Sequence, residues 1–248
     1  MASPELQAAV KRWGAHPEEG VRVVCFGSSN TAMLWHSEGW HNWCGWLECC
    51  LRGWLGGHIH VVNAGISGDT SGDLLNRFGR DVAPHVPSAV IVTIGGNDAA
   101  RAGRAEYRGN LERLIALIRE QRAMPVLQTY YAMLHKECDP KMGENLAPYM
   151  ETCVDTASSR GVPCIDQFSW FEPWYRADPV GYRQIMRDPA HLNPMGNCLM
   201  GILCARSFAL PDPLLPKDME ERAAGLLAEM EKYAALPAAI VTGKGEER

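Results

Sequence analysis

Short apolar runs alternate with longer amphipathic stretches, and this alternation restricts the fold more than any other feature of the chain. Five runs rich in β-branched and other apolar residues predict buried parallel strands, the last being the weakest: Val21–Phe26, Ile59–Val62, Ala89–Ile94, Val126–Tyr130 and Val162–Ile165. Stretches with apolar residues at helical spacing predict helices: Trp40–Leu55, Thr70–Val82, Ala105–Gln121, Asn145–Ser159 and Pro194–Ala209. This order predicts an α/β fold, a three-layer α/β/α sandwich with a parallel sheet of about five strands.

The length of 248 residues allows one or two domains. The predicted core closes near Ala209, and prolines at 211, 213 and 216 interrupt the pattern that precedes them. We therefore predict one domain over residues 1–210, with residues 1–19 as a short helical segment on its outside. Residues 211–248 are predicted as a C-terminal extension, with a helix over Asp218–Ala235 and a frayed end from Thr242.

Charge and composition exclude several classes of protein. The 24 basic and 29 acidic residues give a net charge of −5, which argues against a nucleic-acid-binding protein. No apolar run reaches the roughly 18 residues of a membrane span. The first twenty residues contain no apolar segment typical of a signal peptide, and the nine cysteines are irregularly spaced. We therefore expect a cytoplasmic protein whose thiols stay reduced.

Polar and glycine-rich segments follow the predicted strands. Gly27–Thr31, Asn63–Ser71 and Gly95–Asp98 follow the first three strands, and Asp188–His191 precedes the last core helix. In an open parallel sheet, ligands bind at the carboxyl ends of the strands. These four segments are therefore expected to meet at one edge of the sheet.

The residue types in these segments suit acyl transfer. A serine hydroxyl becomes a good nucleophile when an imidazole takes its proton, and a carboxylate fixes the tautomer of that imidazole. Backbone N–H groups and an asparagine amide can stabilise the oxyanion that forms. Asp188 and His191 are three positions apart, so a single turn of a loop can place the carboxylate beside the ring.

The four segments resemble the four sequence blocks of the SGNH hydrolase superfamily, also called GDSL esterases and lipases. Gly27-Ser28-Ser29, Asn63–Ser71, Gly95–Asp98 and Asp188-x-x-His191 occur in the family's order, and the resemblance spans about residues 21–209. It implies a flavodoxin-like α/β/α sandwich. It also implies hydrolysis of esters of small acids, lipids or acylated sugars, or of thioesters, without a metal or cofactor.

The resemblance implies a role for each matching residue. Ser29 is the nucleophile, His191 is the general base, and Asp188 orients His191. The oxyanion hole is formed by the N–H groups of Ser29 and Gly68 and by the side chain of Asn97.

The first block departs from the family's usual Gly-Asp-Ser, because its middle residue here is Ser28. The usual aspartate braces the loop by hydrogen bonds, which a serine does less strongly, so the departure puts the rigidity of this loop in question. It also leaves two adjacent serines. Ser29 is preferred as the nucleophile because it occupies the third place of the block, with Ser28 as the alternative.

Simpler interpretations stand beside these. Ser29 could only cap a helix, and Asn97-Asp98 could only form a turn, but four blocks in order favour a catalytic site. Gly65–Gly72 lacks the sequence of a phosphate-binding loop. Six residues crowd positions 41–60 at a spacing that fits no zinc finger, so we predict no metal; they are His41, Cys44, Cys49, Cys50, His58 and His60.

Aromatic residues near the blocks are candidates for the walls of an acyl or sugar pocket. The tryptophans at helical spacing from Trp40 to Trp54 are chiefly expected in the core. The candidate substrate-binding residues are Asn30, Trp35, Trp40, Trp170 and Trp174. The segment from Asp139 to Pro148 is expected to be a loop flap over the site or a long connection.

Together these features predict a serine esterase that hydrolyses short-chain acyl esters, with an O-acetyl group on a carbohydrate as the leading substrate. The alternatives are a lipase, lysophospholipase or thioesterase for longer acyl chains, and a binding protein that lost turnover. The expected partner is a small-molecule ester, and a homo-oligomer is left open. Because the base works as neutral imidazole, activity is expected to rise with pH through the range in which histidine ordinarily titrates.

Overall fold

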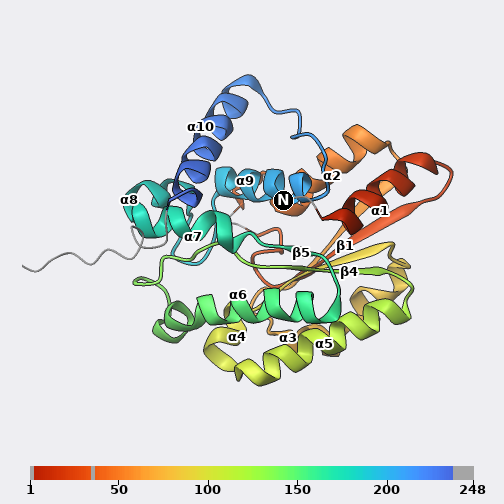
Figure 1. Cartoon of the computed structure of the whole chain (residues 1–248), viewed down its shortest axis with the longest axis horizontal. Coiled ribbons are helices and arrows are strands. Elements are labelled where there is room, and N and C mark those ends of the chain that lie inside the picture. The colour runs from red at the N-terminus through yellow and green to blue at the C-terminus, as the bar shows by residue number, and fades with distance from the viewer. Residues whose placement is uncertain (1–2, 35–36, 237–248) are drawn as a thin grey trace, which may run out of the picture.

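The structure is a computed structural model, and it describes residues 3–34 and 37–236. Its centre is a single parallel sheet with the strand order β2-β1-β3-β4-β5 (Figure 1). The strands are β1 (Val21–Gly27), β2 (Ile59–Gly65), β3 (Ala89–Thr93), β4 (Met124–Gln128) and β5 (Cys164–Ile165). This order is that of a flavodoxin-like sheet, and the predicted α/β sandwich is confirmed.

Helices cover both faces of the sheet (Figure 1). One face carries α1 (Pro4–Ala15), α2 (Trp43–Leu55) and α9 (Pro194–Ser207), and α2 packs along α9. The other face carries α3 (Ser71–Asp81), α4 (Gly96–Arg101), α5 (Arg104–Glu120) and α6 (Pro140–Arg160). Two further helices, α7 (Phe168–Ala177) and α8 (Pro179–Tyr182), lie beside α10 (Lys217–Ala234) at one end of the sheet. Single 3-10 turns form at Ala83–His85 and Arg183–Ile185.

The elements differ in how far their residues are buried, according to how many other elements cover them. Every residue of β3 is buried, because helices cover both of its faces, whereas β2 at the edge is largely half-exposed. Helix α9 is buried over Met195–Ala205, since α2 and α10 enclose it together with the sheet. Its cap, Asn193, lies two residues after His191 and accepts a hydrogen bond from the Gly196 N–H at 3.0 Å, which fixes the start of the helix.

Residues 140–148 belong to α6, so the prediction of this segment as a loop flap or a long connection was wrong, and the helix begins five residues before the predicted start at Asn145. Asp139 caps α6 by accepting hydrogen bonds from the N–H groups of Lys141 and Met142, and Pro140 occupies the first helical position. Pro148 lies inside the helix, where a proline usually signals an end. The short helix α4 and helix α7, which contains Pro173, were also not predicted.

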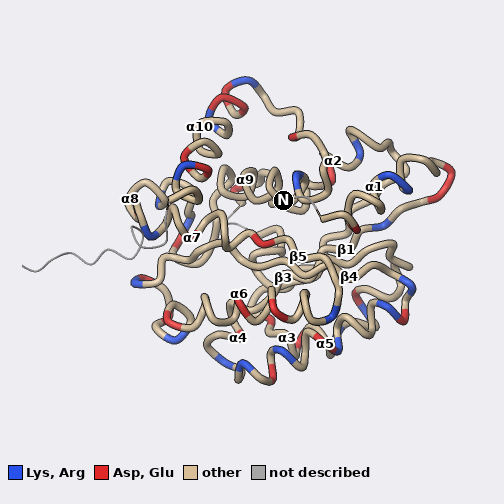
Figure 2. The backbone as a smooth tube through the Cα atoms, viewed as in Figure 1, with Lys and Arg blue, Asp and Glu red and all other residues tan. Residues whose placement is uncertain are grey.

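The two ends of the chain pack against the core as helices. In α1, Leu6 and Trp13 are buried, and the Trp13 ring lies 6.3 Å from that of Phe208. In α10, Leu226, Leu227 and Met230 are buried, and the helix packs mainly on α7. Charged residues gather on the outer helices such as α5 and α10 (Figure 2). The predicted frayed end from Thr242 lies outside the described residues.

In the described part of the chain, no helix combines the length and the hydropathy that crossing a bilayer would need.

Candidate active site

A serine, a histidine and an aspartate form a chain of hydrogen bonds at the carboxyl end of the sheet. Ser29 follows β1, and its Oγ lies 2.9 Å from Nε2 of His191, although 162 positions separate the two residues. Nδ1 of His191 lies 2.9 and 2.8 Å from the two carboxylate oxygens of Asp188. The structure thus brings together the three residues that the sequence predicts as a triad.

A tight turn fixes the carboxylate of Asp188. Its Oδ1 accepts hydrogen bonds from the backbone N–H groups of Ala190 and His191 at 2.8 and 2.9 Å. Partial burial would raise the pKa of Asp188, but these hydrogen bonds and the His191 ring outweigh it, so the pKa lies below its usual value. An ionised Asp188 favours the proton on Nδ1 of His191, which leaves Nε2 to accept from Ser29.

The hydroxyl of Ser29 opens into a pocket of about 200 Å³. The pocket is lined by Ser28, Ser29, Asn30, Ser67, Gly68, Gly96, Asn97, Tyr130, Met133, Met142, Ala190 and His191. The other two candidate oxyanion-hole residues, Gly68 and Asn97, and the candidate Asn30 therefore line the same pocket as the predicted nucleophile, Ser29. The apolar part of the wall comes from the segment after β4 and from the start of α6.

The predicted oxyanion donors lie on three segments: Ser29 follows β1, Gly68 follows β2, and Asn97 is in α4. Gly68 follows β2 with a φ of 87°, a conformation that favours glycine. Asn97 is in the first turn of α4, and its Nδ2 donates to the carbonyl of Asp69 at 2.8 Å. Because an amide nitrogen carries two protons, this hydrogen bond orients the side chain and leaves a second proton to donate to a ligand.

Asp98, the last residue of the third block, ties α4 to α3. Its carboxylate is buried and accepts from the Ser71 N–H at 2.9 Å and from Ser71 Oγ at 2.5 Å. Burial raises the pKa of Asp98, and the hydrogen bonds from Ser71 only partly oppose this. Asp98 therefore holds the helix that carries Asn97 against the rest of the site.

Arg77 on α3 is a further residue of the site that the sequence analysis missed. Its buried guanidinium binds Asp69 at 2.6 Å and Asp81 at 3.0 Å. It also donates to the carbonyl oxygens of Gly27 and Ala64, each at 2.9 Å, at the ends of β1 and β2. Arg77 thus holds together the starting points of the loops that carry Ser29 and Gly68. An arginine on an amphipathic helix gives no signal of this, because most such residues face solvent.

Of the candidate substrate-binding residues that the structure describes, Asn30 lines this pocket, and Trp40, Trp170 and Trp174 do not. Trp40 is 53% exposed and lines a separate hollow with Met195 and Met219. Trp174 is 1% exposed because it packs edge-on against Tyr182 in the core, and Trp170 packs against the core half-buried. Trp35 lies outside the described residues.

The side chains that do form the apolar wall are Tyr130, Met133 and Met142. Tyr130 and Met133 come directly after β4, so the strand-end rule that located the four blocks could also have located them.

Of the histidines and cysteines at positions 41–60, Cys49 and His60 are exposed, and the other four serve packing or hydrogen bonding. His41 packs edge-on against Trp46, Cys44 and Cys50 are buried, and His58 Nε2 lies 3.0 Å from the Trp13 carbonyl. Their arrangement gives the zinc alternative no support.

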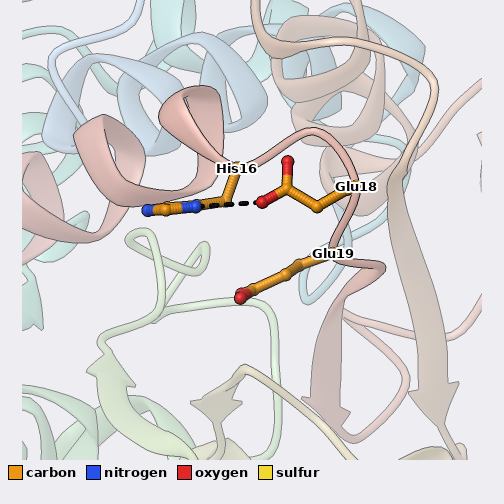
Figure 3. Close-up of side chains that lie close together, drawn as sticks. All are labelled: His16, Glu18 and Glu19. Carbon is orange, nitrogen blue, oxygen red and sulfur yellow. Dashed lines mark hydrogen bonds and ion pairs between the residues drawn. The ribbon is translucent and has the colours of Figure 1, made fainter.

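A group of possible metal ligands, His16, Glu18 and Glu19, lies in the turn between α1 and β1 (Figure 3). All three side chains are exposed, and the turn is at the opposite end of β1 from Ser29. Exposed acidic groups commonly gather without an ion.

Comparisons with known proteins agree with the four blocks. A match to the GDSL-like lipase/acylhydrolase family covers residues 25–198. The uncharacterized lipoprotein YqeF of Bacillus subtilis is 28% identical over 207 residues, which cover 70% of this chain and 84% of that protein. An arylesterase of Vibrio mimicus is 34% identical over 73 residues, which cover 29% of this chain and 36% of that protein.

Solved structures share the fold. Axe2, an acetylxylan esterase from Geobacillus stearothermophilus, superposes with a TM-score of 0.65 at 20% identity, covering 78% of this chain and 96% of the other. A lipase/acylhydrolase from Enterococcus faecalis superposes with a TM-score of 0.60 at 23% identity, covering 79% and 100%. The family match spans most of the chain and includes Ser29, Gly68, Asn97, Asp188 and His191. The chain therefore belongs to the GDSL-like lipase/acylhydrolase family and is a carboxylic ester hydrolase.

Proposed function

We propose that this protein is a serine esterase that removes short acyl groups, with an acetyl group on a carbohydrate as its substrate. The observation that carries the proposal is the hydrogen-bonded chain from Ser29 through His191 to Asp188, which opens into a pocket of about 200 Å³. A pocket of this volume is smaller than those that enclose drug-sized ligands, and it suits a small acyl group.

The proposed reaction has two steps. In the first, Ser29 Oγ attacks the ester carbonyl carbon, and its proton passes to Nε2 of His191. The oxyanion is stabilised by the N–H groups of Ser29 and Gly68 and by Asn97. Its collapse breaks the bond to the alcohol, which leaves with the proton from His191. In the second step, water gives a proton to His191 and attacks the acyl-enzyme, which releases the acid and restores Ser29.

The apolar wall of the pocket supports a short acyl chain. Met133 and Met142 close the space beside Ser29, and Met133 is 2% exposed. The related fold of the Geobacillus acetylxylan esterase supports the assignment of the triad. Its catalytic mutants have been made at a serine, at an aspartate and at a histidine three residues after the aspartate, the same spacing as Asp188 and His191.

Hydrolysis of p-nitrophenyl acetate tests the proposal. Ser29→Ala is expected to lower kcat by at least 10³-fold, which leaves only the catalysis of binding and the oxyanion hole. In Ser28→Ala, by contrast, a fluorophosphonate probe is expected to label Ser29 still. Equal rates for the wild type and Ser29→Ala would contradict the role of Ser29, and a wild type that fluorophosphonate does not label would favour a binding protein.

A series of p-nitrophenyl esters separates the two enzymatic alternatives. The proposal predicts the highest kcat/KM for acetate and a steady fall with chain length. A maximum at eight carbons or more would instead indicate a lipase, lysophospholipase or thioesterase. Release of acetate from acetylated xylo-oligosaccharides tests the carbohydrate part of the proposal.

The cytoplasmic location also remains a proposal. All nine cysteines are free thiols, most of them buried, which supports a reducing compartment. The relative YqeF is described as a lipoprotein, so fractionation of the source cells is the direct test. Recovery of the protein with the membrane or the medium would contradict a cytoplasmic location.

A further inference from the structure

Two consecutive tyrosines follow β4 and reach both loops that carry the proposed triad. Tyr130 contacts the loop of Ser29, and Tyr131 contacts that loop and the loop of His191. Neither residue belongs to the four sequence blocks. Their contacts suggest what replaces the bracing aspartate that the first block lacks.

Tyr130 forms a hydrogen bond with Ser28, the residue at the position of the family's usual aspartate in the first block. Its phenol oxygen lies 2.6 Å from Ser28 Oγ, and both side chains are 1% exposed. A serine side chain is shorter than an aspartate, and the phenol occupies the adjoining space. The ring also rests on Gly96, where an added Cβ would lie 2.5 Å from a Tyr130 ring carbon. Glycine at this position therefore lets the phenol reach Ser28.

Tyr131 joins the two loops directly. Its phenol oxygen lies 2.5 Å from Oδ1 of Asn30 and 2.7 Å from the carbonyl oxygen of Ala190. A phenol has one proton, so the proton is shared between two acceptors. Asn30 follows Ser29, and Ala190 precedes His191, so the contact fixes the neighbours of the two residues that must exchange a proton.

Burial keeps both phenols in place as hydrogen-bonding groups. It raises the pKa of Tyr130 and of Tyr131, so both hydroxyls stay protonated at neutral pH. The two rings stack with 6.3 Å between centroids and an angle of 18°, and Tyr131 also packs at 6.0 Å against Phe171. The rings therefore have little freedom to rotate away from the loops.

We propose that Tyr130 and Tyr131 form a clamp that holds Ser29 in line with His191 and takes over the bracing role of the missing aspartate. Both act as positioning residues, and the inference rests on the esterase function proposed above. A displacement of about 1 Å between reacting groups can cost on the order of 100-fold in rate. Loss of the clamp is therefore expected to lower kcat, with little change in KM.

The variant Tyr131→Phe tests the clamp by removing one oxygen atom. For p-nitrophenyl acetate, kcat is expected to fall roughly 10- to 100-fold, with KM changed less than about twofold. The rate of fluorophosphonate labelling should fall in parallel. The matched control is Tyr182→Phe. The buried Tyr182 hydroxyl donates at 2.6 Å to the Ala132 carbonyl, and neither residue belongs to the loop of Ser29 or to the loop of His191. This control loses a similar buried hydrogen bond and should keep the wild-type kcat.

A double-mutant cycle tests the Tyr130 half of the clamp. Ser28→Ala and Tyr130→Phe break the same hydrogen bond, so their effects on kcat are expected to be less than additive. Additive effects would contradict this half of the proposal. If Tyr131→Phe does not fold, Asn30→Ala removes the acceptor in the Ser29 loop and leaves the contact with Ala190, and it should also lower kcat.

The outcomes separate the clamp from the function on which it rests. A wild type that neither hydrolyses the ester nor reacts with fluorophosphonate overturns the proposed function. An active wild type with equal kcat values for Tyr131→Phe and Tyr182→Phe overturns the clamp alone. Urea unfolding measures the stability of both variants. If kcat falls in both variants in proportion to their loss of stability, the clamp is also overturned.

Discussion

Met133 and Met142 set the size of the space next to Ser29, and methionine is a flexible side chain that fills irregular gaps. We expect Met142→Ala to lengthen the acyl chain that the pocket accepts. The ratio of kcat/KM for p-nitrophenyl octanoate to that for the acetate should rise roughly tenfold, since each methylene accommodated is worth about 1 kcal/mol or more. Met219→Ala, a methionine of the separate hollow at Trp40, is the control and should leave the ratio unchanged.

Asp81 links single-residue electrostatics to stability in acid. Hydrogen bonding to Arg80, and also to Arg77, lowers the pKa of Asp81 to about 2. Its folded-state pKa lies below the unfolded value of about 3.9, so its stabilisation is complete above that value and is lost as pH falls toward 2. Urea unfolding between pH 5 and about 2.5 should therefore show a shallower acid-induced loss for Asp81→Asn than for the wild type. Parallel curves would contradict this assignment.

At the level of elements, α3 depends on one buried cation. Arg77→Ala would leave Asp69 partly buried without its partner, at a cost of about 3 kcal/mol in the free energy of unfolding. It would also release the carbonyl groups at the ends of β1 and β2, so kcat should fall as well. Arg80→Ala is the matched control on the same helix: Arg80 is exposed, and the change should cost less than about 1 kcal/mol. Equal losses in the two variants would show that Arg77 has no special role.

The elements that the sequence predicted correctly are those with strong local signals. In the five strands and the helices around them, apolar residues recur at the spacing of a strand or a helix. The first three blocks follow from the rule for parallel strand ends. The start of α6 was missed because the predicted helix began only at Asn145 and the residues before it were interpreted as a loop flap or a long connection. Its cap, Asp139, with Pro140 at the first position, carried the contrary signal.

Tertiary context explains the remaining differences. The tryptophans were expected near the pocket on proximity in sequence, yet Trp174 faces the core and Trp40 faces a separate hollow. The roles of Arg77, Tyr130 and Tyr131 depend on partners that are distant in the chain. No local pattern in a single sequence reports such contacts.

For the molecule as a whole, the extent of the catalytic domain is still a prediction, with residues 1–210 as the domain and 211–248 as an extension. Helix α10 buries Leu226, Leu227 and Met230 against the core, while every pocket-lining residue lies at or before His191. Deletion of residues 211–248 is thus expected to cost more than about 3 kcal/mol of stability but to keep activity at low temperature. Urea unfolding and p-nitrophenyl acetate hydrolysis measure the two effects. A truncated chain as stable as the full one would show that α10 adds nothing to the core.

The distance of 162 positions between Ser29 and His191 has a consequence for biosynthesis. A ribosome delivers the serine long before the histidine, and the histidine loop is fixed by the cap of α9, the last helix on its face of the sheet. Until that helix has docked, the serine has no base beside it and is an ordinary alcohol. With Ser29 as the proposed nucleophile, the nascent chain is expected to carry no reactive serine, and the first appearance of fluorophosphonate labelling is expected to mark the docking of α9.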